Sequence, residues 1–369
     1  MFIYYYDTNL ETHNYTFIQL FNNTPMIATP NKKTIKTLFT NTPNIDKLKQ
    51  TNNFTLAYRM LQNLLDNTPV TLNNIDLYYH SFKIPKRTGG LRTINAPKDD
   101  LQHVLKESYN IFKNVLHALP HNAAYAYTTG RDTLEAVNQH KASNWFLKLD
   151  VKDFFPSCNK SLLIKQLTQV YPFSIMLQEK PELMSKLLDL CLLNNQLPQG
   201  TNMSPMLTNA IMVPFDYALT KYCEKHGFIY TRYADDLLIS HKEPFSYKSI
   251  QSIITKLFKT LDYPFQIKKE KTRYGSIKGS NWNLGLMLNK DHNITIGHKN
   301  KKIFKAMLNN FLTDLTKNIF WDKIDLHELL GLYSYYHRIE PDYIDYIINQ
   351  FSQKHNIDVI ETIKDQIKN

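Results

Sequence analysis

The sequence predicts an α+β fold, in which a mixed body of helices and strands precedes a small helical domain. Short strand-like runs separated by turn residues alternate with amphipathic stretches such as 101–119 and 249–261. Beyond residue 298 the periodicity is helical only. We therefore expect a mostly helical N-terminal extension over residues 1–74, a catalytic body over 75–297, and a helical domain over 298–369.

Composition limits the partners and the compartment. The 369 residues carry a formal net charge of +11, which suits nucleic acid or an anionic membrane surface, although many soluble proteins are basic without such a partner. The three cysteines form no Cys-x-x-Cys pair, so neither a disulfide framework nor a cysteine zinc site is expected. No apolar run approaches the roughly 18 residues of a membrane span. We expect a cytoplasmic protein without a membrane partner.

The first part of the body predicts a basic hairpin. Residues 75–84 alternate like a strand, and Gly89 and Gly90 provide the backbone freedom for a tight turn before a second strand-like run. An amphipathic helix over 101–119 follows. Residues 144–155 predict a strand that runs into an acidic end and stops at Pro156.

The second part of the body predicts a helix and a second hairpin. Ser204 and Pro205 suit an N-cap and a first helical residue, and Pro214 is expected to kink the helix that they open. Residues 228–233 and 237–240 are the arms of a hairpin with Asp235 and Asp236 at its tip. Residues 265–274, 283–288 and 294–296 are strand-like, and 301–315, 326–337 and 343–351 predict three helices.

Asp235 and Asp236, together with Asp150 at the end of the other acidic strand, form a candidate site for hard cations. Mg²⁺ prefers oxygen ligands and binds through a few carboxylates and the phosphates of a substrate. In two-metal sites the ions serve an in-line phosphoryl transfer, and the Val151 carbonyl would add a ligand. A solvated Asp-Asp turn is the alternative when this pair is considered alone.

An ordered set of motifs surrounds these aspartates. In order, the chain contains GGLRTINAPKDDLQ, YAYTTGRDTLEAV, FLKLDVKDFFPS, LPQGTNMSPMLTN, TRYADDLLIS, KKEKTRYG and NLGLML. This set resembles the reverse transcriptases, specifically the prokaryotic branch of group II intron, retron, diversity-generating and phage-defence enzymes. The resemblance covers roughly residues 80–290. It implies a right-hand polymerase with fingers, palm and helical thumb that copies RNA into DNA.

The resemblance also implies roles for individual residues. Asp150 and Asp235 would each contact two Mg²⁺ ions, for which Mn²⁺ is a possible substitute, and Asp236 would complete the acidic centre. The nucleotide-binding residues would be Lys86, Arg87, Arg92, Asp153, Phe154, Phe155, Gln199, Gly200 and Lys271. Phe155 corresponds to the ring that excludes a ribose 2′-hydroxyl, with an ordinary core aromatic as the alternative.

Two of the basic assignments stay open. Either Lys86 or Arg87 would supply a charge beside Arg92, and a solvated strand edge also explains Lys271. The lysines that follow residue 298 would track the phosphates of a primer–template duplex, with a solvated lysine face as the alternative.

The biological setting is less specific in the sequence. Retron enzymes usually have an Asn-Ala-x-x-His element and a Val-Thr-Gly triplet, where this chain has AVNQHKASN and NLGLML. Our leading hypothesis is a stand-alone, defence-associated bacterial enzyme that uses dNTPs to copy a partner non-coding RNA. The alternatives are retron-type msDNA synthesis, diversity-generating retrotranscription, untemplated or protein-primed synthesis, and a non-catalytic RNA-binding scaffold. The oligomeric state stays open.

Overall fold

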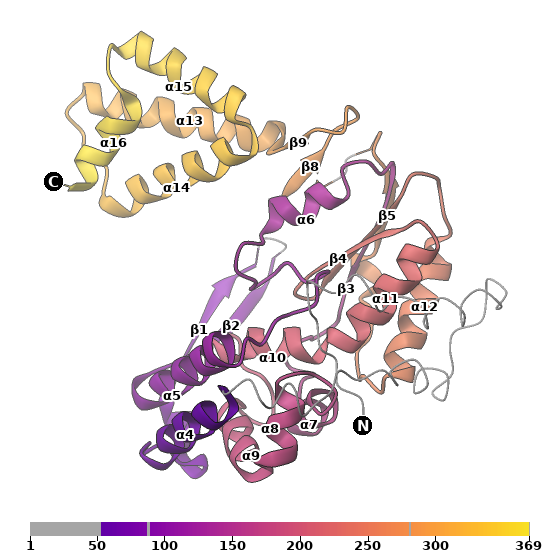
Figure 1. Ribbon diagram of the computed structural model, residues 1–369. Helices are drawn as coiled ribbons and strands as arrows, with labels where there is room; N and C mark the ends of the chain where they lie inside the picture. Colours follow the sequence, from indigo (N-terminus) through magenta and orange to yellow (C-terminus); the bar gives the residue numbers. More distant parts are fainter. Residues whose placement is uncertain (1–52, 87–88, 280–281, 369) are drawn as a thin grey trace. The chain divides into compact units, whose positions relative to one another are not determined.

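The computed structural model describes residues 53–86, 89–279 and 282–368 (Figure 1). The chain divides into two compact units. The first comprises Met1–Arg131, Leu147–Ile239 and Phe245–Tyr274, and the second comprises Asp132–Phe146, Ser240–Pro244 and Gly275–Asn369. Residues 1–52 of the expected helical extension lie outside the described residues. The predicted division of the chain into residues 1–74, 75–297 and 298–369 stays a prediction.

The chain up to residue 276 alternates helices and strands, as expected for the body. Its helices are α4 (Asn53–Asp66), α5 (Asp99–Asn110), α6 (Thr133–Gln139), α7 (Lys160–Leu167), α8 (Phe173–Glu179), α9 (Pro181–Leu190), α10 (Met203–Ile211), α11 (Val213–Lys225) and α12 (Tyr247–Thr260). Two 3-10 helices, η1 (Leu72–Tyr78) and η3 (Lys269–Lys271), and one π-helical turn, η2 (Ile111–Val115), complete the helical elements. The strands are β1 (Tyr79–Pro85), β2 (Leu91–Pro97), β3 (Trp145–Asp150), β4 (Ile229–Tyr233), β5 (Asp236–His241) and β6 (Arg273–Ser276).

A four-stranded sheet with the order β4-β5-β3-β6 carries the acidic strand ends. Leu147 and Leu149 of β3 are fully buried, which accounts for the apolar alternation of that strand. Helices α11 and α12 lie beside the sheet (Figure 1) and stack Phe215 on Phe258 with ring centroids 4.7 Å apart. These aromatic residues belong to one large core that also includes the sheet, so the strand ends are supported by a packed base.

The predicted basic hairpin is confirmed as β1 and β2, which pair antiparallel from Tyr79 with Pro97 to Pro85 with Leu91. Gly89 and Gly90 both have positive φ, +86° and +81°, the backbone region that glycine adopts without steric cost. The strand begins at Tyr79 because residues 72–78 form a 3-10 helix. The candidate Arg87 lies outside the described residues.

The expected start of the helix after LPQG is wrong. Helix α10 begins at Met203, and Ser204 is inside it rather than at the cap. Thr201 takes the capping role, since its hydroxyl accepts a hydrogen bond from the Ser204 amide at 3.1 Å. Pro214 does not kink a long helix but lies in the first turn of the separate helix α11, where its missing N–H costs nothing.

The strand expected over 265–274 is also mostly wrong. An isolated antiparallel bridge joins Ile267 to Val151, the one-turn helix η3 follows, and only β6 is extended. The segment pairs antiparallel with the end of β3 at this one bridge, where the Lys268 amide donates to the Asp150 carbonyl at 2.8 Å and the Lys152 amide donates to the Gln266 carbonyl at 2.7 Å, and pairing with β3 resumes only at β6. Its polar residues offer no apolar face that would extend the pairing.

The second unit combines α6 and a small sheet with the C-terminal helices. Its remaining elements are β7 (Trp282–Asn283), β8 (Leu286–Leu288), β9 (Ile294–Thr295), α13 (Gly297–Thr316), α14 (Lys323–Ile339), α15 (Pro341–His355) and α16 (Val359–Lys368). The predicted hairpin of β8 and β9 and the three predicted helices are confirmed. A fourth helix, α16, was missed, although Val359 and Ile363 bury one face of it in the helical core.

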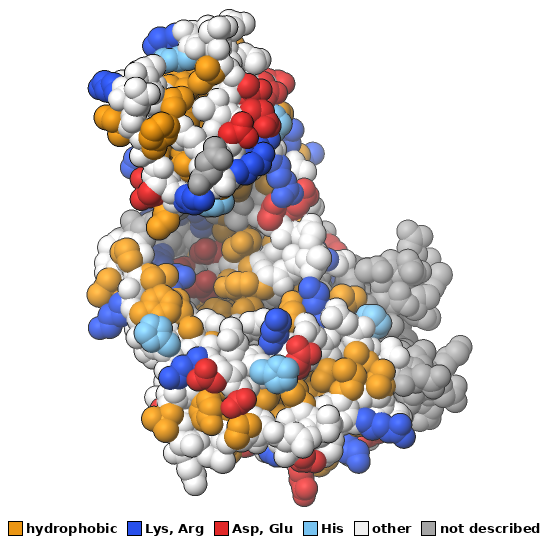
Figure 2. All heavy atoms as spheres, turned by 90° about the vertical axis from the view of Figure 1, so that its left-hand side faces the viewer, with side chains coloured by type: hydrophobic (Ala, Val, Ile, Leu, Met, Phe, Trp, Pro, Cys, Tyr) orange, Lys and Arg blue, Asp and Glu red, His pale blue; other side chains and the backbone are white. Residues whose placement is uncertain are grey.

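The surface gives no simple picture of the net charge. Figure 2 shows basic, acidic and hydrophobic side chains interspersed over the face that it presents. Within the described part of the chain, no helix has the length and apolar character needed to cross a bilayer.

His140, at the end of α6, is buried in a chain of hydroxyl groups. Its Nδ1 lies 2.6 Å from Ser240 Oγ, which donates to Ser143 Oγ at 2.8 Å. Burial lowers the pKa of His140 to about 3. Below pH 6.5 the unfolded chain therefore binds a proton that the folded protein excludes, and the stability falls as the pH falls.

We predict that this buried imidazole makes the protein less stable in mild acid. Between pH 7 and pH 5 it should reduce the free energy of unfolding by about 2 kcal/mol, because the unfolded pKa is near 6.5. Urea denaturation at both pH values should show this loss reduced in His140→Asn. The exposed His103→Asn should keep the wild-type dependence, and an equal effect of the two substitutions would contradict the prediction.

Candidate active site

Three carboxylates meet where β3, β4 and β5 end. Asp150 is the last residue of β3, Asp236 is the first of β5, and Asp235 lies in the turn between β4 and β5. Because β3 and β5 are neighbours in the sheet, these ends are adjacent, and the Val151 amide donates to the Asp235 carbonyl at 3.0 Å. Ala234 turns the chain with a φ of +56°. The structure thus brings together the acidic residues that the sequence predicts.

Two lysines partly balance this negative charge. Lys271 Nζ donates to Asp150 Oδ2 at 2.7 Å, and Lys268 Nζ lies 3.1 Å from Oδ1. Asp150 is 6% exposed, and its Oδ1 is a buried atom without a hydrogen-bond partner among the described residues. Oδ1 of Asp150 is therefore removed from water, and only the ion pair with Lys268 compensates for the lost hydrogen bonds.

The other two aspartates resist ionisation. Burial, and then the Asp150 carboxylate, raise the pKa of Asp235. Burial followed by repulsion from Asp235 and Asp150 raises the pKa of Asp236 to about 6. A divalent cation among these groups would relieve the repulsion and stabilise the ionised forms.

The donor set suits a hard cation, but the described residues do not form a finished cation site. Among them, no group of three or more His, Cys, Asp or Glu side chains is placed to hold a metal ion. The Asp150 carboxylate faces two ammonium groups instead. The buried oxygen of Asp150 and the raised pKa values of its neighbours fit a cation, so metal binding by Asp150, Val151, Asp235 and Asp236 stays a prediction.

The LPQG loop packs against the hairpin strand that carries Arg92. The Asn95 amide of β2 donates to the Gln199 carbonyl at 2.7 Å. Gly200 has a φ of +127°, and a Cβ atom on it would lie 2.8 Å from the Asn95 carbonyl oxygen. Only glycine permits this approach, so the structure joins Gln199 and Gly200 to the predicted nucleotide-binding strand.

The segment after β3 contains two buried rings and one exposed acid. Phe154 packs against Phe265 at 5.1 Å between centroids and meets Phe155 edge-on at 5.7 Å. Asp153 is exposed and has a φ of +45°, and its carbonyl accepts the Ser157 amide at 2.8 Å. The expected roles of these three residues at the triphosphate and sugar stay predictions.

The basic side chains of the hairpin do not contact the three aspartates through any hydrogen bond or ion pair of the described residues. Lys86 and Arg92 are both exposed. Among the described residues, neither side chain forms an ion pair or hydrogen bond with the three aspartates. Their predicted roles require a bound polyanion between the hairpin and the carboxylates.

Sequence reasoning missed the buried group beneath the catalytic turn. Arg232, which is 1% exposed, binds both carboxylate oxygens of Asp216 at 2.7–3.1 Å. Tyr230 donates to the same carboxylate at 2.7 Å, and Arg232 Nη1 donates to Asn209 and to the Ala234 carbonyl, each at 3.1 Å. The position of Arg232 within the TRYADD motif could have marked it as part of the site. Its partners Asp216 and Asn209, however, are 16 and 23 residues away in the sequence.

Lys268 was also missed, although it lies three residues before the predicted Lys271. The run KKEK contains three lysines in four residues, and only the fold shows which of them reach Asp150.

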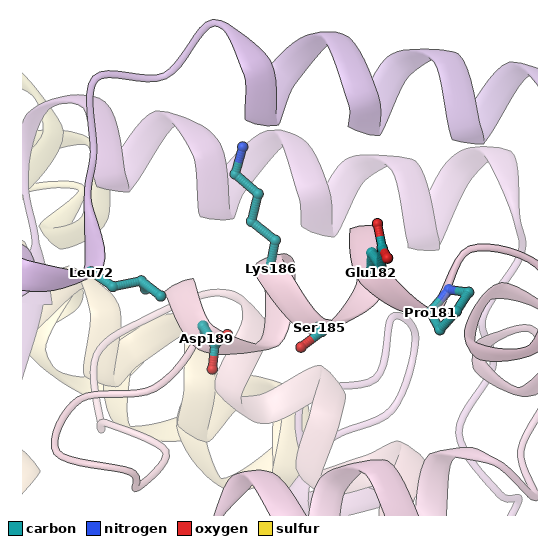
Figure 3. A pocket seen from close by; sticks show the side chains of 6 residues that line it. All are labelled: Leu72, Pro181, Glu182, Ser185, Lys186 and Asp189. Carbon is teal, nitrogen blue, oxygen red and sulfur yellow. The ribbon is translucent and has the colours of Figure 1, made fainter.

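A surface pocket formed by η1 and α9 contains none of the candidate residues. It measures about 500 Å³ and is lined by Leu72, Pro181, Glu182, Ser185, Lys186 and Asp189 (Figure 3). Lys160 already binds Asp189 at 2.7 Å and Ser185 at 2.8 Å, and Lys186 donates to the Leu65 carbonyl at 2.7 Å. Ser185, Lys186 and Asp189 therefore already have polar partners within the protein, and the pocket carries no argument for a ligand.

Comparison with known proteins identifies the class. The family described as "Reverse transcriptase (RNA-dependent DNA polymerase)" matches residues 84–302, more than half of the chain and all three aspartates. The chain belongs to the reverse transcriptase family and is an RNA-directed DNA polymerase that takes an RNA template. Members of this family depend on divalent metal ions.

Relatives of this chain include several retron enzymes. Retron Ec83 reverse transcriptase of Escherichia coli is 26% identical over 84% of this chain and 95% of that protein. Retron Mx162 reverse transcriptase of Myxococcus xanthus is 36% identical over 44% of this chain and 36% of that protein. Among solved structures, the apo telomerase of Candida tropicalis covers 78% of this chain and 61% of that chain, with 11% identity and a TM-score of 0.45.

We predict that the buried Asp216 is needed to hold Arg232 in place. Asp216→Asn should lower the free energy of unfolding by roughly 3–5 kcal/mol, because it leaves a buried guanidinium without its counter-charge. Tyr230→Phe removes one hydrogen bond to the same carboxylate and should cost only about 1 kcal/mol. Urea denaturation of both variants checks this, and equal losses would show that the ion pair has no special weight.

Proposed function

We propose that this chain is a retron-like enzyme that copies a partner non-coding RNA into DNA by metal-assisted phosphoryl transfer from dNTPs. The observation that carries the proposal is the convergence of Asp150, Asp235 and Asp236 at adjacent strand ends. A retron-type system is favoured over the diversity-generating and protein-primed alternatives, because Retron Ec83 reverse transcriptase is matched over 95% of its length. A role in anti-phage defence rests on the resemblance to phage-defence enzymes.

The carboxylates and the Val151 carbonyl would hold two Mg²⁺ ions. When bound, these ions supply the Lewis-acid charge that activates the primer 3′-hydroxyl and stabilises the leaving pyrophosphate. The chain's own contribution is to fix the oxygen ligands before substrate arrives. Burial fixes the position of Asp150, and the ions would take the place of the ammonium groups of Lys268 and Lys271 that pair with its carboxylate.

The nucleotide would lie between the acidic centre and the hairpin. The Arg92 guanidinium, exposed on β2, suits bidentate contact with a triphosphate. Gly200 lets the LPQG loop pack against β2, which would keep Gln199 beside the nucleotide, and the Phe155 ring would close the space that a 2′-hydroxyl needs. Lys271, which is 46% exposed beside Asp150, would contact phosphate oxygens.

Helix α13 would contact the phosphates of the primer–template duplex. Its residues Lys299, Lys302 and Lys305 are exposed. Lys301 has a different role, because its Nζ pairs with Glu340 at 2.6 Å and lies 4.1 Å from the centre of the Tyr343 ring. Lys299, Lys302 and Lys305, but not Lys301, therefore remain available for phosphate contacts, and the contribution of these contacts to binding should weaken with added salt.

We predict that the acidic centre is required for catalysis but not for binding. Asp150→Ala and Asp235→Asn should each reduce dNTP incorporation roughly 1,000-fold or more, since several kcal/mol of transition-state stabilisation are lost. Primer extension on an RNA template measures this, and filter binding measures the duplex affinity, which should stay within a few-fold.

The exposed Asp100→Asn is the matched control and should extend primers normally. Full activity in Asp235→Asn would contradict the assignment. Duplex binding by a wild-type protein that incorporates no dNTP would favour the non-catalytic scaffold.

We predict that Phe155 excludes ribonucleotides. Phe155→Val should reduce the preference for dCTP over CTP by about 10- to 100-fold in kcat/KM, because the removed ring opens space worth roughly 1–3 kcal/mol. Phe258→Val removes the same volume from the core beside α12 and should leave the preference unchanged. A preference that changes equally in both variants would assign Phe155 to the core.

A further inference from the structure

The segment that precedes α6 runs beside the catalytic hairpin. Ala124 forms a parallel bridge with Arg232 of β4: the Arg232 amide donates to Ala123 at 2.7 Å, and the Tyr125 amide donates to Arg232 at 2.8 Å. Both segments turn after this bridge, and Tyr127 lies close enough to Asp235 for the Asp235 carboxylate to act on its hydroxyl. Tyr127 lies within the YAYTTGRDTLEAV motif but is not among the predicted site residues.

A buried amide holds these two positions together. Asn209 of α10 donates through Nδ2 to the Ala126 carbonyl at 2.9 Å, and its Oδ1 accepts Arg232 Nη1 at 3.1 Å. The same Nη1 donates to the Ala234 carbonyl. The residue before Tyr127 and the residue before Asp235 are therefore fixed by one hydrogen-bonded group, so the side chains that follow them keep their spacing.

The backbone at Tyr127 is in a conformation that bulky residues avoid. Its φ is +60°, in the left-handed region that favours glycine. Arg131 maintains the loop by donating to the carbonyls of His121, Asn122 and Ala124 at 2.9–3.1 Å, and the Thr128 hydroxyl donates to Ala126 at 3.2 Å. Strain that the surrounding structure enforces is concentrated at functional sites.

More than half of the Tyr127 side chain is exposed, although it stands in a strained backbone. Tyr127 is 56% exposed, unlike Tyr125 in the same loop, which is buried. Burial of part of the side chain, and then the Asp235 carboxylate, raise the pKa of Tyr127, while Arg92 acts in the opposite sense. The hydroxyl thus stays protonated, and the partly exposed side chain lies within electrostatic range of both Asp235 and Arg92.

We propose that Tyr127 stacks on a nucleobase of the base pair at the reaction centre. The inference rests on the proposed function, which makes Asp235 part of that centre. A neutral aromatic face is a sequence-tolerant platform for bases, whereas the acidic side chains next to it would repel any anion that approached without cations. The ring would hold the base pair in register with the carboxylates while Arg92 and Lys271 contact the phosphates.

The test uses full-length protein and an RNA–DNA primer–template with 2-aminopurine at the templating position. In equilibrium binding without dNTP, wild-type protein and Tyr127→Phe should quench the fluorescence by stacking. Tyr127→Ala should lose the quenching and bind the duplex roughly tenfold more weakly. Tyr346→Ala, which removes a ring of similar exposure (58%) from α15, should behave as wild type.

Further measurements separate stacking from other causes. A 2-aminopurine eight base pairs away should respond equally in all variants. Tyr127→Gly, which fits the positive φ, should melt no lower than wild type and still lose the quenching, so that misfolding is not the cause. Loss of quenching in Tyr127→Phe would overturn stacking in favour of a role for the hydroxyl.

The outcomes for the inference and for the proposed function are distinct. Wild-type extension of the primer with quenching unchanged in Tyr127→Ala overturns the inference and leaves the polymerase assignment intact. A wild-type protein that extends no primer overturns the proposed function, and quenching in the same sample still decides whether Tyr127 stacks on the base.

Discussion

The buried ion pair between Arg232 and Asp216 is the interaction on which the catalytic face depends. Arg232 is held on one side by α11, through Asp216, and on the other by α10, through Asn209. Its Nη1 also donates a hydrogen bond to the Ala234 carbonyl, which fixes the turn that carries Asp235. Burial alone would lower the pKa of Arg232, but Asp216 outweighs it and raises the pKa, so the guanidinium keeps its charge in the core.

Charge balance at the acidic centre follows from this rigidity. Burial, and then the repulsion among three carboxylates held together at strand ends, raises the pKa values of Asp235 and Asp236, while Lys268 and Lys271 form ion pairs with Asp150. A cation bound among these carboxylates would offset part of this penalty.

Local patterns predicted the elements well where one residue type has one structural use. Gly89 and Gly90 predicted a turn, and their positive φ values explain why. The pattern failed where the partner was distant. Thr201 rather than Ser204 caps α10, and η3 interrupts the pairing of residues 265–271 with β3 after one bridge, because both outcomes depend on hydrogen bonds whose geometry only the folded chain defines.

The sequence by itself determined the class of the protein, since the ordered motifs and the aspartates at predicted strand ends are local patterns that survive without coordinates. Only the tertiary structure decided how the site is built. It selected Lys268 and Lys271 as the partners of Asp150, placed Arg232 beneath the catalytic turn, and brought Tyr127 beside Asp235. These contacts join residues up to 121 positions apart, and no periodicity within a short window encodes which distant groups will meet when the core closes.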